Sequence, residues 1–532
     1  MEKVKEFLQK PWIYLFILII GVSLKFYHID YRYFWYDELE TILHTSGIPD
    51  DTYNSIFPKN EIHSIEEYND LLRLNKQDYT IGEQLKGISK LTNLNPLHYM
   101  LLVFWHRLAG DQDFHYRLFN VFFFLLTLPF LFFLAKILFR SGLAGWIAVC
   151  LFSVSPFFHF YAHEARYNML CAFLLVASHY FLLKALYQNK LKWWLAYWIS
   201  GSMLLYATIL GGVAIIGHLL FVVFFKKEYR LQFGLSFLGI LLIYLPWLVS
   251  VFNHREEILG ALYWHTIYGN LSFARLLIFQ LLDLSNVFVN FVSFTQHWQL
   301  IYHNQFQGNI IEFTFNCILI LLILYGIIQV FRQYSKEVSW FLMLSIIPFF
   351  LFMYVSDLVR GAGMSLYWRY HLIYFIGILL VMTGFLSSKT ERRHWIRISA
   401  FSILIILGLI SIYTISQEKY REVYFPGEDQ IACMEIISGS ENPLLISDFS
   451  FWAGTVNAFL TISNSCKCDN IDVLYVANNI QNVEEMLKDT DYSEIFVAYL
   501  SYELTDNLRA QFGERMKPVE IEGISALWQI KL

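Results

Sequence analysis

Residues 117–139 read RLFNVFFFLLTLPFLFFLAKILF, an apolar run with few polar side chains between Asn120 and Lys136. A helix needs roughly 20 such residues to cross the hydrocarbon core of a bilayer. Similar runs recur along the chain, which predicts a polytopic α-helical membrane protein. We expect eleven spans, at residues 11–27, 117–139, 143–161, 168–187, 193–208, 210–226, 231–251, 309–331, 338–356, 369–387 and 396–415.

The composition of the whole chain agrees with this fold class. Of 532 residues, 56% are hydrophobic, 18% aromatic and only 16% charged, whereas soluble domains average about 45–50% apolar and about 25% charged residues. A soluble fold would have to expose large apolar patches, so soluble, disordered and fibrous classes are excluded. The net charge of −5 provides no basic field for a nucleic-acid partner.

Basic residues indicate how the spans are oriented, because Lys and Arg favour cytoplasmic loops. With eleven spans, they all gather at one side: Lys3, Lys5, Lys10, Lys136, Arg140, Lys184, Lys190, Lys192, Lys226, Lys227, Arg230, Arg332, Lys336, Lys389, Arg392, Arg393 and Arg397. The external side then carries residues 28–116, 252–308 and 416–532. Residues 271–294 are expected to form an amphipathic helix at the interface; a twelfth span is the alternative.

The C-terminal part, residues 416–532, has an ordinary soluble composition. Strand-like runs (444–447, 471–476, 494–500, 527–532) alternate with helix-like stretches (483–487, 504–512), which favours an external α/β domain. We therefore expect a transmembrane domain over 1–415, including the loop 28–116, and a second domain over 416–532. Its Cys466 and Cys468 can pair with Cys433 or remain reduced.

Acidic side chains cluster where the first external loop begins. Residues 28–41 read HIDYRYFWYDELET, and the aromatic residues suit the interfacial belt near the headgroups. Asp37 and Glu38 point about 100° apart on a helix, so one can face a site while the other supports it. The structural alternative is that Asp37 caps the helix that follows.

A second polar cluster follows the third predicted span, on the same external face. Residues 155–167 read SPFFHFYAHEARY, and Glu164 and Arg166 can both project from one turn. His163-Glu164 lacks the second histidine of a zinc-protease motif, because position 167 is Tyr. The structural alternative is an ion pair at headgroup level, which contributes little if exposed.

Two weaker features complete the external polar groups. Residues 95–99 read NPLHY and lead through Gly110 to Arg117, where the second span begins. Arg360-Gly-Ala-Gly363 and Trp368-Arg369-Tyr370 lie at the outer mouth of the span 369–387. Mid-span His179 and His218 are expected to hydrogen-bond neighbouring helices rather than form a proton relay, because no chain of intramembrane carboxylates accompanies them.

The order of these motifs resembles the GT-C superfamily of polytopic glycosyltransferases. The motifs are Trp35-Tyr36-Asp37-Glu38, then Asn95-Pro-Leu-His98-Tyr99, then Tyr161-Ala-His-Glu164-Ala-Arg166-Tyr167, and Arg369-Tyr370 before a late span. The nearest branch is that of protein O-mannosyltransferases and aminoarabinose–lipid A transferases. The resemblance is good over about 1–230 and weaker up to 415. The chain departs from the aminoarabinose branch at Asn95, where that branch tends to have lysine, and in lacking an evident proline downstream of Arg369-Tyr370.

The resemblance implies an external active site, a polyprenyl-phosphate sugar donor and an inverting transfer. The first-loop catalytic aspartate of the family corresponds to Asp37, with Glu38 beside it. The acidic residue of the next external loop corresponds to Glu164, which Arg166 follows. Metal use varies in the superfamily, so a divalent cation shared by Asp37, His163 and Glu164 stays open.

The chemistry fits the location of these residues. Nucleotide sugars are made in the cytoplasm, so an external transferase needs a donor that has already crossed the bilayer, such as a sugar on a lipid phosphate. Arginine binds phosphate oxygens with two parallel hydrogen bonds and stabilises charge on the leaving phosphate. We expect Arg166, Arg369, Arg117 or Arg360 in this role, and substrate contacts from Tyr36, Asn95, His98, His163, Tyr167 and Tyr370.

We therefore predict that Asp37 takes the proton of an acceptor hydroxyl while Glu164 orients the acceptor or Asp37. The acceptor is a lipid, a glycan or a protein, and the expected location is the bacterial inner membrane. A surface-polysaccharide polymerase or ligase, a lipid-linked sugar transporter and a non-enzymatic scaffold are the alternatives. The prediction requires Asp37, Glu164 and an arginine to converge on one outward-facing pocket.

Overall fold

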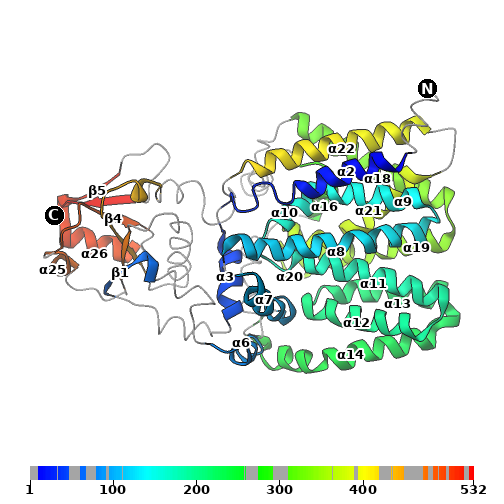
Figure 1. Ribbon diagram of the computed structural model, residues 1–532, viewed down its shortest axis with the longest axis horizontal. Coiled ribbons are helices and arrows are strands. Elements are labelled where there is room, and N and C mark those ends of the chain that lie inside the picture. Colours follow the sequence, from blue (N-terminus) through cyan, green and yellow to red (C-terminus); the bar gives the residue numbers. More distant parts are fainter. Residues whose placement is uncertain are drawn as a thin grey trace. The chain divides into compact units, whose positions relative to one another are not determined.

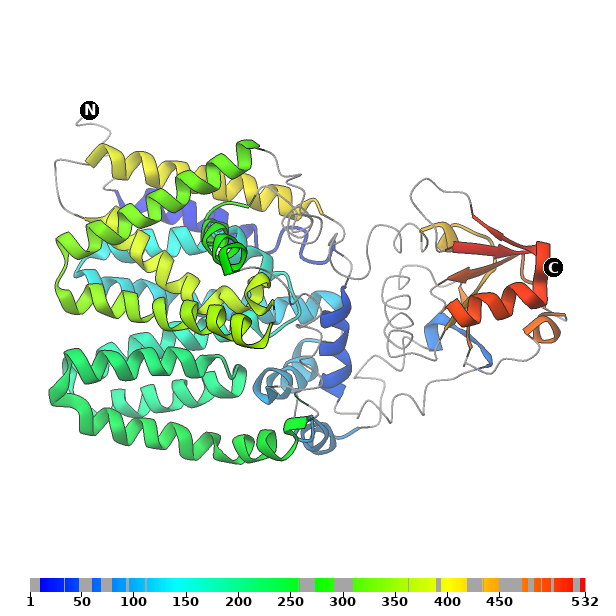
Figure 2. The same cartoon turned by 180° about the vertical axis from the view of Figure 1, so that it is seen from behind.

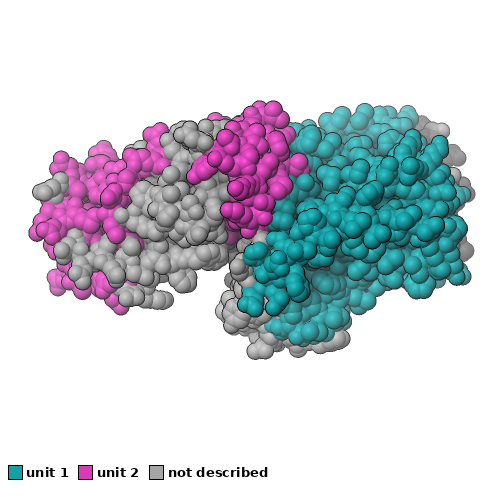
Figure 3. Space-filling view, turned by 90° about the horizontal axis from the view of Figure 1, so that it is seen from below, with its two compact units in different colours: residues 1–29, 92–98, 116–417 teal, residues 30–91, 99–115, 418–532 magenta. Residues whose placement is uncertain are grey.

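The computed structural model has two compact units, shown in different colours in Figure 3, and each is described by itself. Unit 1 comprises residues 1–29, 92–98 and 116–417, and unit 2 comprises residues 30–91, 99–115 and 418–532. The structure describes residues 10–32, 34–46, 60–67, 79–91, 95–110, 112–256, 258, 273–290, 310–361, 363–388, 394–418, 433, 435–448, 471–476, 483–488, 490–498, 502–519 and 527–531. Cys466 and Cys468 lie outside these residues.

Unit 1 is a bundle of apolar helices (Figure 1). They are α2 (Pro11–Ser23), α8 (Asp113–Phe139), α9 (Gly142–Ser153), α10 (Pro156–Ala162), α11 (Asn168–Gln188), α12 (Leu191–Ala207), α13 (Gly211–Phe225), η2 (Lys227–Tyr229), α14 (Arg230–Asn253), α16 (Phe273–Asp283), η4 (Leu284–Val287), α18 (Ile310–Gln333), α19 (Lys336–Leu344), α20 (Ile347–Arg360), η5 (Met364–Leu366), η6 (Trp368–His371), α21 (Leu372–Ser387) and α22 (His394–Ser416). α7 (Pro96–Ala109) begins in this unit and continues into unit 2.

The helices confirm a polytopic α-helical membrane protein. Within the described residues, seven helices are long and apolar enough to cross a bilayer, or eight if α9 and α10 count as one bent span. The predicted spans 11–27 and 210–226 correspond to the shorter helices α2 and α13. The span count of eleven therefore stays a prediction. The predicted span 143–161 is not one straight helix, because it bends by 60° between α9 and α10.

The core of unit 1 forms around α21, which is apolar on every side and buried along its whole length. α14, in contrast, leaves most of its surface exposed, as a helix facing lipid does. α2 and α22 run side by side in both views of the cartoon (Figures 1 and 2), and the rings of Tyr14 and Phe401 lie 5.7 Å apart between them.

The mid-span histidines hydrogen-bond neighbouring helices, as predicted. Nε2 of His218 lies 3.2 Å from Nδ1 of His179, and Nε2 of His179 lies 3.2 Å from the Ser345 hydroxyl. The Tyr197 hydroxyl lies 3.1 Å from Nδ1 of His218. The network joins α11, α12 and α13 to the break between α19 and α20, and thereby satisfies polar groups that would be costly in hydrocarbon.

Unit 2 contains a six-stranded sheet in the order β1-β3-β2-β4-β6-β5. β2 (Pro443–Asp448), β3 (Asp472–Val476) and β4 (Glu494–Ala498) are parallel, and β6 (Leu527–Ile530) and β5 (Met516–Pro518) extend the sheet antiparallel. α26 (Tyr502–Phe512, red in Figure 2) covers one face with α25 (Val483–Leu487). The four strand-like runs expected in the tail coincide with β2, β3, β4 and β6.

One edge of this sheet comes from the first loop instead of the tail. β1 (Ile62–Ser64) pairs antiparallel with β3, and Ile62 lies opposite Leu474. The same unit contains α3 (Tyr36–Ser46) and α6 (Ile81–Ile88). The domain boundary expected at 415/416 therefore divides residues that the compact units group together: the tail and much of the first loop.

Candidate active site

The bend between α9 and α10 shapes the segment that carries Glu164 and Arg166. The hydroxyl of Ser155 accepts the N–H of Phe158 at 3.5 Å, and Pro156 occupies the first helical position, where a missing N–H costs nothing. The absence of a side chain at Gly408 allows α22 to pack directly against the bend, because a Cβ there would lie only 2.4 Å from the carbonyl oxygen of Val154. α10 ends at Ala162, and residues 163–167 then form a turn before α11.

Glu164 lies in that turn, and its side chain is 2% exposed. The amide of Asn168, in the first turn of α11, donates to Oε2 of Glu164 at 3.1 Å. The Asn120 amide on α8 donates to the backbone carbonyl of Glu164. α11 thus orients the carboxyl group and α8 holds the backbone of the same residue. The burial of Glu164 argues against the exposed headgroup-level ion pair considered above.

The turn meets residues 367–370 at Tyr167. The Arg166 guanidinium carbon lies 5.7 Å from the centroid of the Tyr167 ring, and the His98 ring lies edge-on to it at 6.5 Å. Burial raises the pKa of the Tyr167 hydroxyl, the nearby Tyr370 raises it further, and the positive charges of Arg369 and Arg166 act in the opposite direction. Both predicted arginines therefore lie near the half-buried Tyr167.

Arg369 is itself held between aromatic rings. Its guanidinium carbon lies 5.2 Å from the ring centroid of Tyr370 and 5.5 Å from that of Tyr367. Stacking of this kind orients the planar guanidinium while leaving its edge able to bind an anion. We call Arg166, Tyr167, Arg369 and Tyr370 the arginine–tyrosine cluster.

Other predicted site residues of unit 1 occupy different surroundings. Arg117 is buried and donates to the carbonyl of Ile29 at 2.9 Å. Arg360 is exposed at the end of α20, with Nη1 at 3.6 Å from the sulfur of Met364. Nε2 of His163 lies 2.8 Å from the backbone carbonyl of Lys25 and must donate to it. Asn95 is half-buried directly before Pro96, the first residue of α7.

The acidic pair of the first loop belongs to unit 2. α3 begins at Tyr36, so Asp37 and Glu38 both lie in its first turn, close to the positive end of the helix. Oε2 of Glu38 accepts the backbone N–H of Trp35 at 3.4 Å, which is one capping contact at the start of α3. Both side chains are buried. The side chain of Tyr36 lies outside the described residues.

Asp37 and Glu164 thus belong to different compact units. Their convergence with an arginine on one pocket stays a prediction. Among the described residues, no group of three or more His, Cys, Asp or Glu is placed to hold a metal ion.

Sequence analysis did not single out several buried ionisable residues of unit 1: Lys25, Asp283, Asp357 and His371. Lys25 could have been noticed, since a lysine at the outer end of a span runs against the orientation rule. Asp283 is the single acidic residue in the predicted interfacial helix 271–294. Its importance depends on partners far along the chain.

Comparisons with known proteins agree with this fold. Residues 94–252 match the profile of a family described as dolichyl-phosphate-mannose-protein mannosyltransferase. No curated protein sequence matches the chain. The structure is similar to that of ArnT from Cupriavidus metallidurans bound to undecaprenyl phosphate, with a TM-score of 0.53, 12% identity, and coverage of 97% of this chain and 98% of that one. The apo form of the same ArnT gives a TM-score of 0.53 at 13% identity, with coverage of 97% of each chain.

The oligosaccharyltransferase AglB from Archaeoglobus fulgidus, in complex with an inhibitory peptide and a dolichol-phosphate, is more distant. It has a TM-score of 0.47 and 10% identity, with coverage of 92% of this chain and 69% of that one. The predicted resemblance is confirmed: the chain has the fold of GT-C membrane glycosyltransferases of the mannosyltransferase and ArnT-like type.

Proposed function

We propose that this protein is a membrane glycosyltransferase that moves a sugar from a polyprenyl-phosphate donor to an acceptor hydroxyl. The observation that carries the proposal is the arginine–tyrosine cluster, where Arg166 and Arg369 lie near the half-buried Tyr167, three residues after the buried Glu164. The ArnT of similar fold was solved with undecaprenyl phosphate, which supports a donor of the same chemical class.

The cluster suits a lipid phosphate. Two guanidinium groups offer several N–H donors, and paired hydrogen bonds to phosphate oxygens are about twice as strong as neutral ones. Their positive charge also stabilises the negative charge that grows on the phosphate as the sugar leaves. Tyr167 and Tyr370 orient the guanidinium planes, and the burial of Arg166 strengthens its electrostatic effect.

The acid–base step falls to the carboxyl groups. Asp37 accepts the proton of the acceptor hydroxyl as the oxygen attacks the anomeric carbon, and the configuration at that carbon inverts. Glu38 has a supporting role, since its carboxyl accepts the Trp35 N–H at the start of α3. Glu164, which Asn168 holds in place, orients the acceptor.

The predicted orientation of the spans supports an active site on the external face of the bacterial inner membrane, where a lipid-linked donor would be exposed. Residues 1–415 form the membrane transferase, and residues 416–532 form an external α/β domain. The edge strand β1 ties that domain to the first loop, so it helps to shape the loop on which Asp37 lies.

The test is sugar transfer by the purified full-length protein in lipid nanodiscs. Undecaprenyl phosphate carrying a radiolabelled hexose or aminopentose is supplied with lipid A, a Ser/Thr peptide or a glycan as acceptor. Label on an acceptor, with an anomeric configuration opposite to that of the donor, supports the proposal. Label that crosses the bilayer without a new bond identifies a transporter and overturns it. If only a preassembled lipid-linked polysaccharide is transferred, and a single lipid-linked sugar is not, the protein is a ligase and the proposal is overturned.

A further inference from the structure

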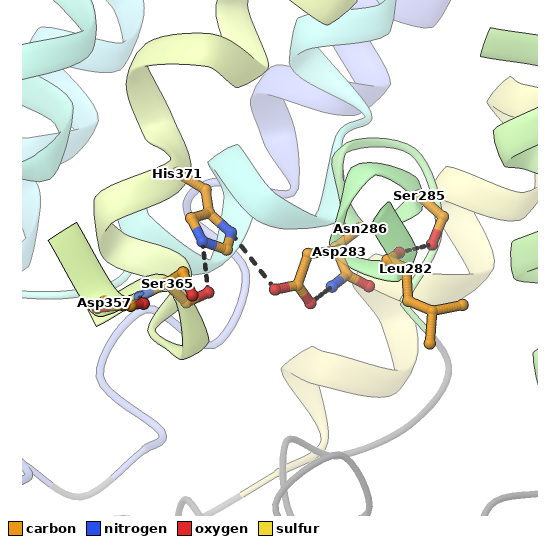
Figure 4. A network of polar contacts seen from close by, with 7 residues as sticks. All are labelled: Leu282, Asp283, Ser285, Asn286, Asp357, Ser365 and His371. Carbon is orange, nitrogen blue, oxygen red and sulfur yellow. Dashed lines mark hydrogen bonds and ion pairs between the residues drawn. The ribbon is translucent and has the colours of Figure 1, made fainter. Parts of the chain in front are cut away.

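A second buried carboxyl group lies near the arginine–tyrosine cluster. Asp283 is the last residue of α16 and is 4% exposed. Its Oδ1 accepts the amide of Asn286 at 3.1 Å, and its Oδ2 lies 3.5 Å from Nδ1 of His371 (Figure 4). The Trp368 side chain also hydrogen-bonds Asp283.

The state of His371 follows from its other partner. Nε2 of His371 lies 2.8 Å from the backbone carbonyl of Ser365. A carbonyl can only accept, so Nε2 carries a hydrogen, and Nδ1 faces Asp283. The contact between Asp283 and His371 is attractive when the pair holds one further proton, either on the carboxyl group facing a bare Nδ1 or on Nδ1 facing a carboxylate.

Ser365 lies in the turn that follows α20. This turn is also held by Asp357, which is 1% exposed. The two oxygens of Asp357 accept the backbone N–H groups of Met364 and Ser365 at 2.8 and 2.7 Å. Figure 4 shows the resulting chain from Asp357 through Ser365 and His371 to Asp283. The turn after α20 is therefore held by two buried carboxyl groups, one from α20 and one from α16.

Asp283 contacts the residue before and the residue after the pair Arg369-Tyr370, which is the part of the cluster proposed to bind the donor phosphate. Its partners Trp368 and His371 flank Arg369 and Tyr370 in the sequence. We propose that Asp283 is a positioning residue that, through Trp368 and His371, fixes Arg369 and Tyr370 for binding the lipid phosphate. This inference rests on the proposed function, because it takes Arg369 as a phosphate ligand.

A purely structural role for Asp283 would be unusual in energetic terms. Burying an ionised carboxyl group costs on the order of several kcal/mol unless its partners compensate for the lost hydration. Replacing a buried ion pair by apolar side chains is often neutral or stabilising. A carboxyl group retained at this position is better explained by geometry that an apolar side chain cannot provide.

The probe is undecaprenyl phosphate, and the measurement is its binding to the full-length protein in nanodiscs. Groups that orient metal ligands typically affect affinity by roughly 10–100-fold, and we expect Asp283→Ala to weaken binding by about tenfold on the same basis. Asp283→Asn should recover most of the affinity, because an amide can still accept from Trp368 and Asn286 and donate to His371. Saturating donor should restore kcat in Asp283→Ala, so the loss should appear in KM.

The control is Ser285→Ala, in the neighbouring helix η4. The Ser285 hydroxyl donates to the carbonyl of Leu282 at 2.7 Å and lies 3.0 Å from Oδ1 of Asn316. It is buried like Asp283 but touches neither Trp368 nor His371 in these contacts. Unchanged affinity in Ser285→Ala with a loss in Asp283→Ala supports the proposal; equal losses overturn it.

A double-mutant cycle separates this inference from the proposed function. If Asp283 acts through Arg369, the double variant Asp283→Ala/Arg369→Ala binds no more weakly than Arg369→Ala alone. Additive losses overturn the inference. Full binding by Arg369→Ala would instead remove the phosphate role on which the proposed function depends. If Asp283→Ala does not fold, His371→Phe is measured in the same cycle and decides by the same criteria.

Discussion

Asn168 donates its side-chain amide to the buried carboxyl group of Glu164, four residues earlier in the chain, at 3.1 Å. The contact joins the first turn of α11 to the turn that follows α10. It helps to give the Glu164 carboxyl group a fixed direction. If Glu164 orients the acceptor as proposed, Asn168 should matter for transfer as well.

Asn168→Ala should lower both stability and transfer. Hydrogen bonds to charged groups contribute about 1.5–3 kcal/mol, and we expect a loss of stability of that order together with weaker acceptor binding. The measurements are the apparent melting temperature in detergent and KM for the acceptor. Asn168→Asp should be worse, because two carboxyl groups would then face each other. An Asp variant as stable as the parent would contradict this account of Glu164.

Asp37→Asn should abolish most of the transfer activity while the protein remains folded. General-base assistance contributes roughly 10²–10⁴-fold, and we expect a fall in kcat within that range. Glu38→Gln is the matched control, since an amide oxygen can still accept the Trp35 N–H. It should keep transfer within a few-fold of the parent. Equal activity of Asp37→Asn and the parent would exclude Asp37 as the base.

Arg369→Ala should weaken the binding of undecaprenyl phosphate by about 10–100-fold, the equivalent of one or two charge-assisted hydrogen bonds. Arg369→Lys should recover only part of it, because an ammonium group does not form the paired bonds of a guanidinium. Arg332→Ala, which removes an exposed arginine from the last turn of α18, is the control. Equal binding by Arg332→Ala and Arg369→Ala would show that only net charge matters.

Gly408→Ala should destabilise the bundle at the bend between α9 and α10. The new Cβ would lie 2.4 Å from the carbonyl oxygen of Val154, and overpacking of this kind costs about 1–3 kcal/mol. Gly234→Ala in α14 is the control, as its Cβ would meet nothing within 4 Å. Alanine there should raise the melting temperature slightly, since glycine in a helix interior costs roughly 0.5–1 kcal/mol.

Lys25→Met should raise the melting temperature. Lys25 is completely buried, its Nζ lies 5.0 Å from the centroid of the Phe124 ring, and among the described residues it has no hydrogen-bond acceptor. Replacing buried charges by apolar side chains of similar volume is often neutral or stabilising by about 1–4 kcal/mol. A lower melting temperature of Lys25→Met would show that the ammonium group contributes to the fold.

Local sequence patterns predicted the elements that depend on few long-range partners. Apolar length predicted the long spans, and the alternation of the tail coincides with β2, β3, β4 and β6. The same reasoning missed β1, because Ile62–Ser64 is too short for a periodic signal and becomes a strand only by pairing with β3. It also treated 143–161 as one helix, although Ser155-Pro156 marks the point where the chain bends by 60°.

The candidate site shows the same division. The residue types of the acidic and basic clusters were visible as motifs, and the fold they implied is confirmed. Asp283 lies in a segment with no motif, and its contact with His371, which directly follows the motif Trp368-Arg369-Tyr370, spans α18, α19 and α20 in the sequence.

Hydropathy and motif order alone therefore determined that this chain crosses a membrane many times and has the GT-C fold. The free energy of transferring a segment from water into the bilayer depends on the residues of that segment and can be read from the sequence. Only the tertiary structure decided which arginines gather at Tyr167, which carboxyl groups are buried, and that the first loop supplies the edge strand β1. Those outcomes depend on which side chains meet, and hydrogen bonds and burial are set by partners that the linear sequence does not name.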